Sequence, residues 1–295
     1  MIRQFNMLLV NAFANEAFSG NTTGVVIADN LSSDEMQNIA RDLQQPETVF
    51  VERLDIDRYM TRFFTPKREI ELCGHATIAT FYALAELGYI SPIEDGVKSV
   101  IQHTNCGKTK VDIEYKYGEV SRVHMYLGDL KIENVNIEEE LEMALGISKD
   151  RIGLTMGSYV PKIVSCGNVS LVVPLKSKED IGNIVLNEAF AEELSNRIGA
   201  MSIQVFTTED GESVHQRTFS PAIGVAEEMA SGTSTAATLY YMAEEGINKS
   251  NKSQHRQGLE ADRKSDLYAS YDSAKGVVKV GGQAFVYLSG VLSIK

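Results

Sequence analysis

Two short turns carry the side chains best suited to chemistry in this 295-residue chain. Residues 73–88 read CGHATIATFYALAELG and residues 231–246 read SGTSTAATLYYMAEEG, so the two segments agree at half of their positions. Each begins with a reactive or polar head, Cys73 or Ser231, followed by glycine and small or hydroxyl residues. This composition lets a backbone turn come close to a bound group.

The segments before the two turns are also repeated, since RFFTP (residues 62–66) recurs as RTFSP (residues 217–221). The repeats predict a duplicated domain, each half ending its core with a helix that starts at the turn. The first turn of a helix leaves N–H donors and a partial positive charge, which suit a carboxylate or an enolate-like oxygen. Two such helices facing each other would form an anion cradle between the halves. The alternative is a pair of ordinary helix starts capped by Ser or Thr.

The size and charge of the chain narrow the possible functions. With 43% hydrophobic residues, 295 residues suffice for two domains of ordinary size. The formal net charge of −12 argues against nucleic acid or anionic lipid as a partner, because a phosphate-binding surface needs clustered Lys and Arg. No apolar run is long enough for a signal peptide or a membrane span. We therefore expect a soluble, cytoplasmic protein.

The cysteines do not indicate a structural metal or a disulfide framework. Cys73, Cys106 and Cys166 are widely spaced and form no C-x-x-C motif, which predicts reduced thiols and no zinc site. A glycine-rich nucleotide-binding motif is also absent from the sequence. The sequence predicts no cofactor and no metal.

The remaining pattern mixes helices and strands. The S-x-x-E capping box at Ser32 opens a helix that ends before Pro46. The nearly uncharged helix after Cys73 is expected to be enclosed by a curled sheet. Residues 248–266 are polar and are expected to form a surface loop, and residues 276–294 to form two strands, broken at 281–282 and at Gly290. Further strands are expected at residues 7–14, 24–28, 48–52, 59–64, 110–115, 120–127, 162–164, 171–175, 203–207 and 216–219, and further helices at 137–145 and 187–198.

Taken in order, several motifs resemble those of the phenazine-biosynthesis isomerase (PhzF-like) family over essentially the whole chain. They are NAFANEAFSGN, PETVF, FFTP, ELCGHATIAT, RTFSPAIGVAEEMASGTSTAA, QGLEADRKS and VKVGG. The resemblance implies an α+β, diaminopimelate epimerase-like fold with two pseudo-symmetric halves, each a curved, mostly antiparallel sheet around a central helix. It places the halves at residues 1–128 and 129–281, with residues 282–295 returning to the first half as a final strand. It also implies a homodimer.

The same resemblance implies a set of site residues in the cleft between the halves. Glu47 in PETVF would be the catalytic glutamate, His75 in GHAT the motif histidine, and Glu228 would stand where phenazine-pathway members have Asp. The substrate carboxylate would be bound next to Ser231 by the backbone N–H groups of two pairs of residues, Gly74 with His75 and Gly232 with Thr233.

This chain also departs from the family pattern. Cys73 stands where the phenazine isomerase has a small inert residue, and Glu228 is one methylene longer than Asp. In the segment QGLEADRKS, Asp262 and Lys264 replace the family's Gly and Pro. These changes leave the small carboxylated substrate unidentified.

Proton transfer next to a carboxylate needs a base, an acid and donors that hold the developing charge. Glu47 can serve as acid and base, and enclosure is expected to raise its pKa into a useful range. The alternative is a solvated Glu after Pro46, and His75 is equally interpretable as a buried structural histidine.

Cys73 leaves a second set of alternatives open. Related racemases use two facing cysteines, but the matching position here is Ser231, whose hydroxyl does not ionise near neutrality. Single-base chemistry is open to Glu47, as in the isomerases, or to Cys73, as in an epimerase or dehydratase of the same fold. If Cys73 takes no part in the chemistry, it is a small residue that fills space in the core. If neither residue acts as a base, the chain is a non-catalytic protein that binds a carboxylate.

Overall fold

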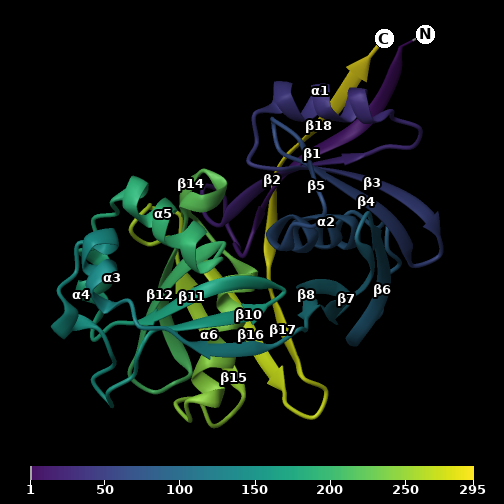
Figure 1. Ribbon diagram of the computed structural model, residues 1–295. Coiled ribbons are helices and arrows are strands. Elements are labelled where there is room, and N and C mark those ends of the chain that lie inside the picture. Colours follow the sequence, from purple (N-terminus) through teal and green to yellow (C-terminus); the bar gives the residue numbers. More distant parts are fainter. Residues whose placement is uncertain (1) are drawn as a thin grey trace. The chain divides into compact units, whose positions relative to one another are not determined.

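The computed structural model describes residues 2–295 and groups them into two compact units. Unit 1 contains the chain up to Tyr126 together with Gly281–Lys295, and unit 2 contains Leu127–Val280. None of the helices within residues 2–295 is long and apolar enough to cross a membrane. Figure 1 shows the elements of both units.

Unit 1 consists of strands with two helices. Its elements are β1 (Arg3–Ala12), β2 (Asn21–Ile27), α1 (Ser33–Leu43), β3 (Thr48–Asp55), β4 (Arg58–Phe64), β5 (Glu69–Ile70), α2 (Gly74–Glu86), β6 (Gly96–Thr104), β7 (Gly107–Lys116), β8 (Glu119–Leu127) and β18 (Ala284–Ile294).

Unit 2 has the same mixture with two more helices and two 3₁₀ turns. Its elements are β9 (Lys131–Asn134), α3 (Glu138–Leu145), η1 (Lys149–Arg151), β10 (Lys162–Cys166), β11 (Asn168–Pro174), α4 (Lys178–Gly182), α5 (Glu188–Ile198), β12 (Ser202–Thr208), β13 (Ser213–Ser220), η2 (Pro221–Ile223), β14 (Val225–Glu228), α6 (Gly232–Glu244), β15 (Lys252–Gln257), β16 (Ser265–Asp272) and β17 (Val277–Gly282).

Both units repeat one topology. Across unit 1 the strands run β18, β1, β2, β3, β4, β6, β7, β8, and the pairs β2/β3 and β4/β6 are parallel while the others are antiparallel. Across unit 2 they run β9, β10, β11, β12, β13, β15, β16, with β11/β12 and β13/β15 parallel. Each parallel pair needs a crossover, and the second crossover of each unit carries α2 or α6. The duplication predicted from sequence is therefore present in the order and direction of the strands.

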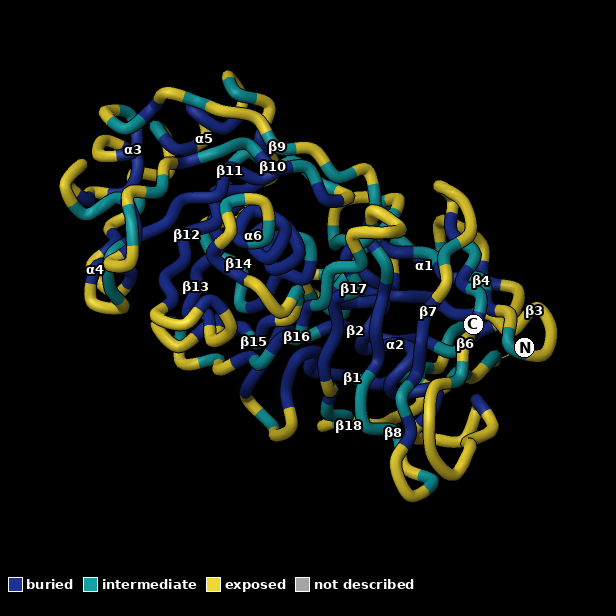
Figure 2. Tube along the Cα trace, turned by 90° about the horizontal axis from the view of Figure 1, so that it is seen from below, coloured by how far each residue is buried: buried dark blue, intermediate teal, exposed yellow. Residues whose placement is uncertain are grey.

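The helices α2 and α6 form the centres of the two units. Every residue of α2 from His75 to Ala85 is buried, and so is every residue of α6 from Ser234 to Met242. Figure 2 shows both helices in the colour of buried residues among the strands. A helix that is apolar on all sides is stable only when enclosed. The predicted enclosure of the Cys73 helix by a curled sheet is confirmed, and the fold class is α+β.

A repeated ion pair secures the strand that leads to each central helix. Arg62 on β4 binds Glu69 on β5 through two nitrogens, each 2.7 Å from a carboxylate oxygen. Arg217 on β13 binds Glu227 on β14 in the same way, with both contacts at 2.8 Å. Bidentate pairs of this kind fix orientation as well as position. The RFFTP and RTFSP repeats thus encode the same anchoring of β5 and β14.

Two expectations about elements were wrong. Residues 248–266 contain the strand β15, whose Ser253, His255 and Gln257 are buried, instead of an entirely exposed loop. These three buried residues alternate with Lys252, Gln254 and Arg256, which is the period of a strand. The pattern was not recognised in the sequence because the inward-facing side chains are polar. Gly290 does not break the last strand, because β18 continues from Ala284 to Ile294 and pairs with β1, with one register shift between Leu9 and Val10.

Replacing Gly281 by Ala is expected to destabilise the protein by about 3 kcal/mol or more. A Cβ atom at this position would lie 2.0 Å from the Val123 carbonyl oxygen and 2.6 Å from His124 Nδ1. The matched control is Gly290→Ala in β18, where a Cβ atom meets nothing within 4 Å and stability should change by about 0.5 kcal/mol or less. Urea unfolding measures both, and equal effects of the two changes would contradict the packing around Gly281.

Candidate active site

Glu47 is held by its own backbone. It directly precedes β3, and its carbonyl oxygen accepts hydrogen bonds from the Gly24 amide at 3.0 Å and from the Thr23 hydroxyl at 2.9 Å. Both donors lie on β2, which pairs in parallel with β3. The carboxyl group therefore extends from a fixed point at the edge of the sheet, and its side chain is 19% exposed. The alternative of a solvated Glu after Pro46 does not fit this environment.

The α2 turn (residues 72–75) brings a thiol and an imidazole to the same place. Cys73 is the N-cap residue of α2 and His75 lies in its first turn. The Cys73 Sγ atom is 3.3 Å from His75 Nδ1, and His75 Nε2 is 3.0 Å from Glu47 Oε2. The imidazole thus lies between the thiol and the carboxyl group and presents a different nitrogen to each. Sequence analysis named all three residues, and the structure brings them together.

One oxygen of Glu47 has no hydrogen bond. Although Oε2 is within ion-pair distance of His75, it is buried and has no hydrogen-bond partner among the described residues. This oxygen is therefore ready to accept a proton or a hydrogen bond from a bound molecule.

The charges of the three groups are coupled. Burial raises the pKa of the Glu47 carboxyl, but the neighbouring His75 outweighs burial and holds that pKa below 4.5. Burial alone would lower the pKa of His75, yet its interactions with Cys73 and with the Glu47 carboxylate raise it well above 6.5. Burial raises the pKa of the Cys73 thiol more than His75 lowers it. At neutral pH the cluster thus holds a carboxylate, an imidazolium and a thiol.

This result corrects the expectation that enclosure raises the pKa of Glu47. Enclosure acts in that direction, but the positive charge of His75 at 3.0 Å acts more strongly in the other. At neutral pH Glu47 is consequently ionised, so it can accept a proton but has none to donate, and the acid function falls to His75 or Cys73.

The α6 turn (residues 230–233) uses its hydroxyl group differently. The Ser231 Oγ atom accepts a hydrogen bond from the Ser234 amide at 3.4 Å and donates one to Ser234 Oγ at 3.1 Å. Cys73 makes no such capping bond to α2. Ser231 therefore caps α6, as expected for an ordinary helix start, whereas the matching residue Cys73 contacts a histidine. Gly232 and Thr233 follow in the first turn of α6, where backbone N–H groups lack intrahelical acceptors.

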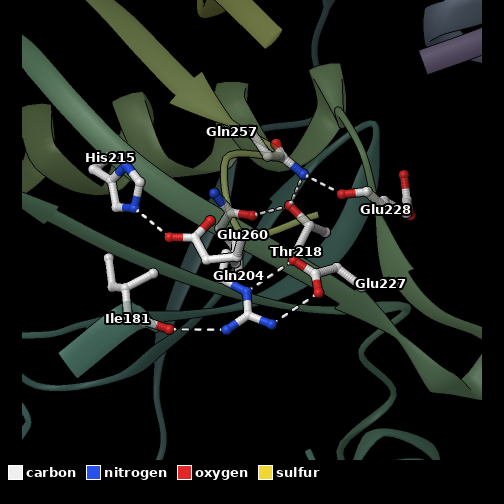
Figure 3. Close-up of polar contacts among 9 residues, drawn as sticks. Ile181, Gln204, His215, Thr218, Glu227, Glu228, Gln257 and Glu260 are labelled. Atoms are coloured by element: carbon white, nitrogen blue, oxygen red, sulfur yellow. Dashed lines mark hydrogen bonds and ion pairs between the residues drawn. The ribbon is translucent and has the colours of Figure 1, made fainter. Parts of the chain in front are cut away.

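Glu228 lies at the end of β14, just before the α6 turn. Its Oε1 atom accepts a hydrogen bond of 2.6 Å from the Ser220 hydroxyl. Its carbonyl oxygen accepts one of 2.7 Å from the Gln257 amide, as Figure 3 shows. The structure places Glu228, Ser231, Gly232 and Thr233 in unit 2 and the other site residues in unit 1. That the residues of unit 1 and those of unit 2 bind the same ligand stays a prediction.

Gln257 fixes the α6 turn and was missed by sequence analysis. Its Nε2 group donates to the Glu228 carbonyl and, at 3.1 Å, to Thr218 Oγ1. Its Oε1 atom accepts from the Ser231 amide at 3.2 Å and from Gln216 Nε2 at 2.9 Å. These four bonds use the whole capacity of a buried amide. The only sequence signal was its place in the QGLEADRKS motif, within a segment interpreted as a loop.

The donors and acceptors in the buried hydrogen-bond network around Gln257 can be assigned. Burial lowers the pKa of His255 to about 3, so its ring is neutral. Gln216 Oε1 lies 2.7 Å from His255 Nδ1 and accepts a hydrogen bond from it, while the Ser253 hydroxyl lies 2.7 Å from Nε2. Gln216 Nε2 then donates to Thr235 Oγ1 on α6 at 2.8 Å. A buried hydrogen-bonded network of this kind favours one arrangement of the backbone.

The neighbouring strand face carries a separate set of charges. His215 Nε2 lies 2.8 Å from Glu260, and Arg217 also donates to the Ile181 carbonyl at 2.9 Å (Figure 3). These contacts connect β13 to α4 and to the loop after β15. They lie on the face of β13 opposite Gln216, and they anchor the strand that leads to β14.

Comparison with known proteins identifies the family. The model of the PhzC-PhzF family, described as phenazine biosynthesis-like protein, matches residues 10–290. The chain belongs to this family. An uncharacterized isomerase of Clostridium acetobutylicum is 32% identical over 310 aligned positions, which cover 99% of each chain. The uncharacterized isomerase YfhB of Bacillus subtilis is also 32% identical, over 95% of this chain and 94% of its own.

Solved structures agree with the family and the fold. The PhzF-family phenazine biosynthesis protein of Bacillus anthracis superimposes with a TM-score of 0.84 at 25% identity, covering 98% of this chain and 99% of its own. A hydroxyproline epimerase from Agrobacterium vitis superimposes with a TM-score of 0.63 at 14% identity, covering 99% and 92%. The second likeness concerns the fold alone. The family and fold class expected from the sequence motifs are confirmed.

Replacing Glu47 by Gln should destabilise the protein by about 1–3 kcal/mol, in a pH-dependent manner. The lowered pKa of Glu47 contributes stability above 4.5 that is lost as pH falls through the folded-state value. The raised pKa of His75 contributes stability below 6.5 that is lost as pH rises through its folded-state value. The difference between wild type and variant should therefore be largest between pH 4.5 and 6.5. Urea unfolding over a pH series measures it, and a constant difference would refute the ion pair.

Replacing Gln257 by Leu should cost about 3 kcal/mol or more, since it leaves the Ser231 amide, the Glu228 carbonyl and Gln216 without their partner. The control is Gln254→Leu on the same strand, whose partly buried amide donates one bond of 3.3 Å to Tyr268. That change should cost less than about 1 kcal/mol. Thermal or urea unfolding compares the two variants, and equal losses would mean that the network contributes no particular stability.

Proposed function

We propose that this protein is a cofactor-independent isomerase that relocates a proton on a small carboxylated substrate, with Glu47 as the base. The observation that carries the proposal is the position of the Glu47 carboxylate, whose buried Oε2 atom lies 3.0 Å from Nε2 of His75 beside the first turn of α2. Membership of the PhzF family, whose relatives include proteins named isomerases, supports the reaction class.

The residues around Glu47 fit the remaining roles. His75, as an imidazolium, can return the proton to the substrate or stabilise the carboxylate between the two steps. The amides of the first turn of α2, including Gly74, can donate to an oxygen on which negative charge develops. In this proposal Gly232 and Thr233 bind the substrate carboxylate, with Glu228 beside them, in a cleft to which both units contribute. The proposal further includes a cytoplasmic homodimer.

A Cys73-dependent epimerase or dehydratase is the second candidate. It is favoured by the 3.3 Å contact between Cys73 Sγ and His75 Nδ1, which is the arrangement of a thiol with its base. Against it stands the raised pKa of the thiol, which keeps the thiolate scarce at neutral pH. A third candidate, a carboxylate-binding protein without turnover, retains the same groups and predicts no proton exchange.

The test is solvent deuterium exchange into a panel of small carboxylic acids, followed by mass spectrometry. Glu47→Gln should reduce exchange by about 10³-fold, because it removes the base. The matched control Glu52→Gln changes an exposed carboxyl on β3, the strand that Glu47 directly precedes, and should leave exchange unchanged. Cys73→Ser should retain exchange within about tenfold.

Each other outcome favours a different candidate. Loss of exchange in Cys73→Ser together with its retention in Glu47→Gln would transfer the role of base to the thiol. Binding of a carboxylate without any exchange in the wild type would indicate a protein that only binds its ligand.

A further inference from the structure

The donor atoms of Glu47, Cys73 and His75 also have the composition of a metal site. A carboxylate oxygen, a thiol sulfur and an imidazole nitrogen are the three ligand types that proteins offer to zinc. These atoms lie within 4.8 Å of one another, and residues 2–295 contain no other group of three such side chains this close together. Sequence analysis, which relied on the spacing of cysteines, expected no metal here.

The distances are compatible with a single ion. Two donors on one zinc ion are separated by at most the sum of their bond lengths, about 4.4 Å for sulfur and nitrogen and about 4.3 Å for nitrogen and oxygen. Cys73 Sγ is 4.0 Å from His75 Nε2, and that nitrogen is 3.0 Å from Glu47 Oε2. An ion between them would bind Nε2 and use the oxygen that has no hydrogen bond. Small rotations of the two flanking side chains complete the set.

Charge and access also favour occupation. Glu47 and thiolate Cys73 together carry two negative charges, which balance a divalent cation that replaces the imidazolium proton. The first turn of α2 opposes a cation but favours the thiolate, so its net effect is small. The Glu47 side chain is 19% exposed, so an ion can approach the cluster from the side of this carboxylate. Three protein ligands leave one position for water, which is typical of an exchangeable site.

We propose that Glu47, Cys73 and His75 bind a thiophilic divalent cation of the Zn²⁺ type, and that the bound ion inhibits proton transfer at this site. The cation binds the Glu47 carboxylate, displaces one proton from the Cys73 thiol and one from the His75 imidazolium, and releases both to solvent. The ion is no cofactor of the reaction, because it engages the base. The inhibition, though not the binding, rests on the proposed function.

The direct test is titration of the untagged, chelator-treated protein with Co²⁺, whose thiolate complexes absorb in the near ultraviolet. The wild type should develop this band and lose it on addition of Zn²⁺. Cys73→Ser should abolish the band, and the matched control Cys106→Ser, which alters an exposed thiol, should retain it. Ser is the native residue at the corresponding position of α6, so Cys73→Ser is expected to fold.

The other two ligands have their own expected results. His75→Asn and Glu47→Gln should each weaken Co²⁺ binding by about 10-fold to 100-fold. Zn²⁺ should protect Cys73, but not Cys106, from iodoacetamide, and its binding should release about two protons per site at a pH where both groups are protonated. A wild-type protein without the band at saturating Co²⁺, or a band lost only in Cys106→Ser, would overturn the site. Unchanged affinity in Glu47→Gln would overturn the three-ligand assignment.

These measurements need no substrate, so they separate this proposal from the proposed function. If Co²⁺ binds at Cys73 and Glu47→Gln retains full isotope exchange, the base assignment fails and the metal site stands. If Co²⁺ does not bind and Glu47→Gln abolishes exchange, the metal site fails and the isomerase stands. Where both hold, Zn²⁺ should suppress exchange at concentrations that fill the site.

Discussion

The structure depends on enclosing a nearly uncharged helix within a curled sheet. Because α2 and α6 are buried along almost their whole length, neither can carry charged side chains where it contacts the sheet. Groups that bind or react with an anion are best placed where a helix begins, since its first N–H groups lack intrahelical partners. In both units the reactive or hydroxyl residues therefore lie at that point, and the Arg–Glu pairs on β4 and β13 anchor the strands that lead to it.

The two copies have diverged at this shared point. In unit 2 the hydroxyl of Ser231 caps α6, and Gln257 holds the backbone on both sides of the turn with a neutral, saturated network. In unit 1 the thiol of Cys73 leaves the cap and meets His75, which in turn meets Glu47. One turn is thus held by neutral hydrogen bonds, whereas the other brings a thiol, an imidazole and a carboxyl group together.

Much of this was readable from the sequence, and what was missed had a physical cause. The segments that begin at Cys73 and Ser231 form buried helices, and a buried helix has few charged residues. The repetition of this unusual composition was therefore visible in the sequence and predicted the duplicated topology. The motifs around Glu47 and His75 placed these residues in one site. Gln257 escaped notice because inward-facing polar side chains look like a surface loop when their partners are unknown. The pKa of Glu47 was misjudged because it depends on a 3.0 Å contact with a residue distant in sequence.

The pairing of β1 with β18 has a consequence for how the chain is made. Unit 2 is one continuous segment, whereas unit 1 is interrupted and needs residues that come after the whole of unit 2. During synthesis all of unit 2 leaves the ribosome before β18, so the half that contains the carboxylate, imidazole and thiol cannot be completed until its closing strand is made. Loss of the final strand would therefore remove the partner of β1 in unit 1 and leave the segment of unit 2 whole.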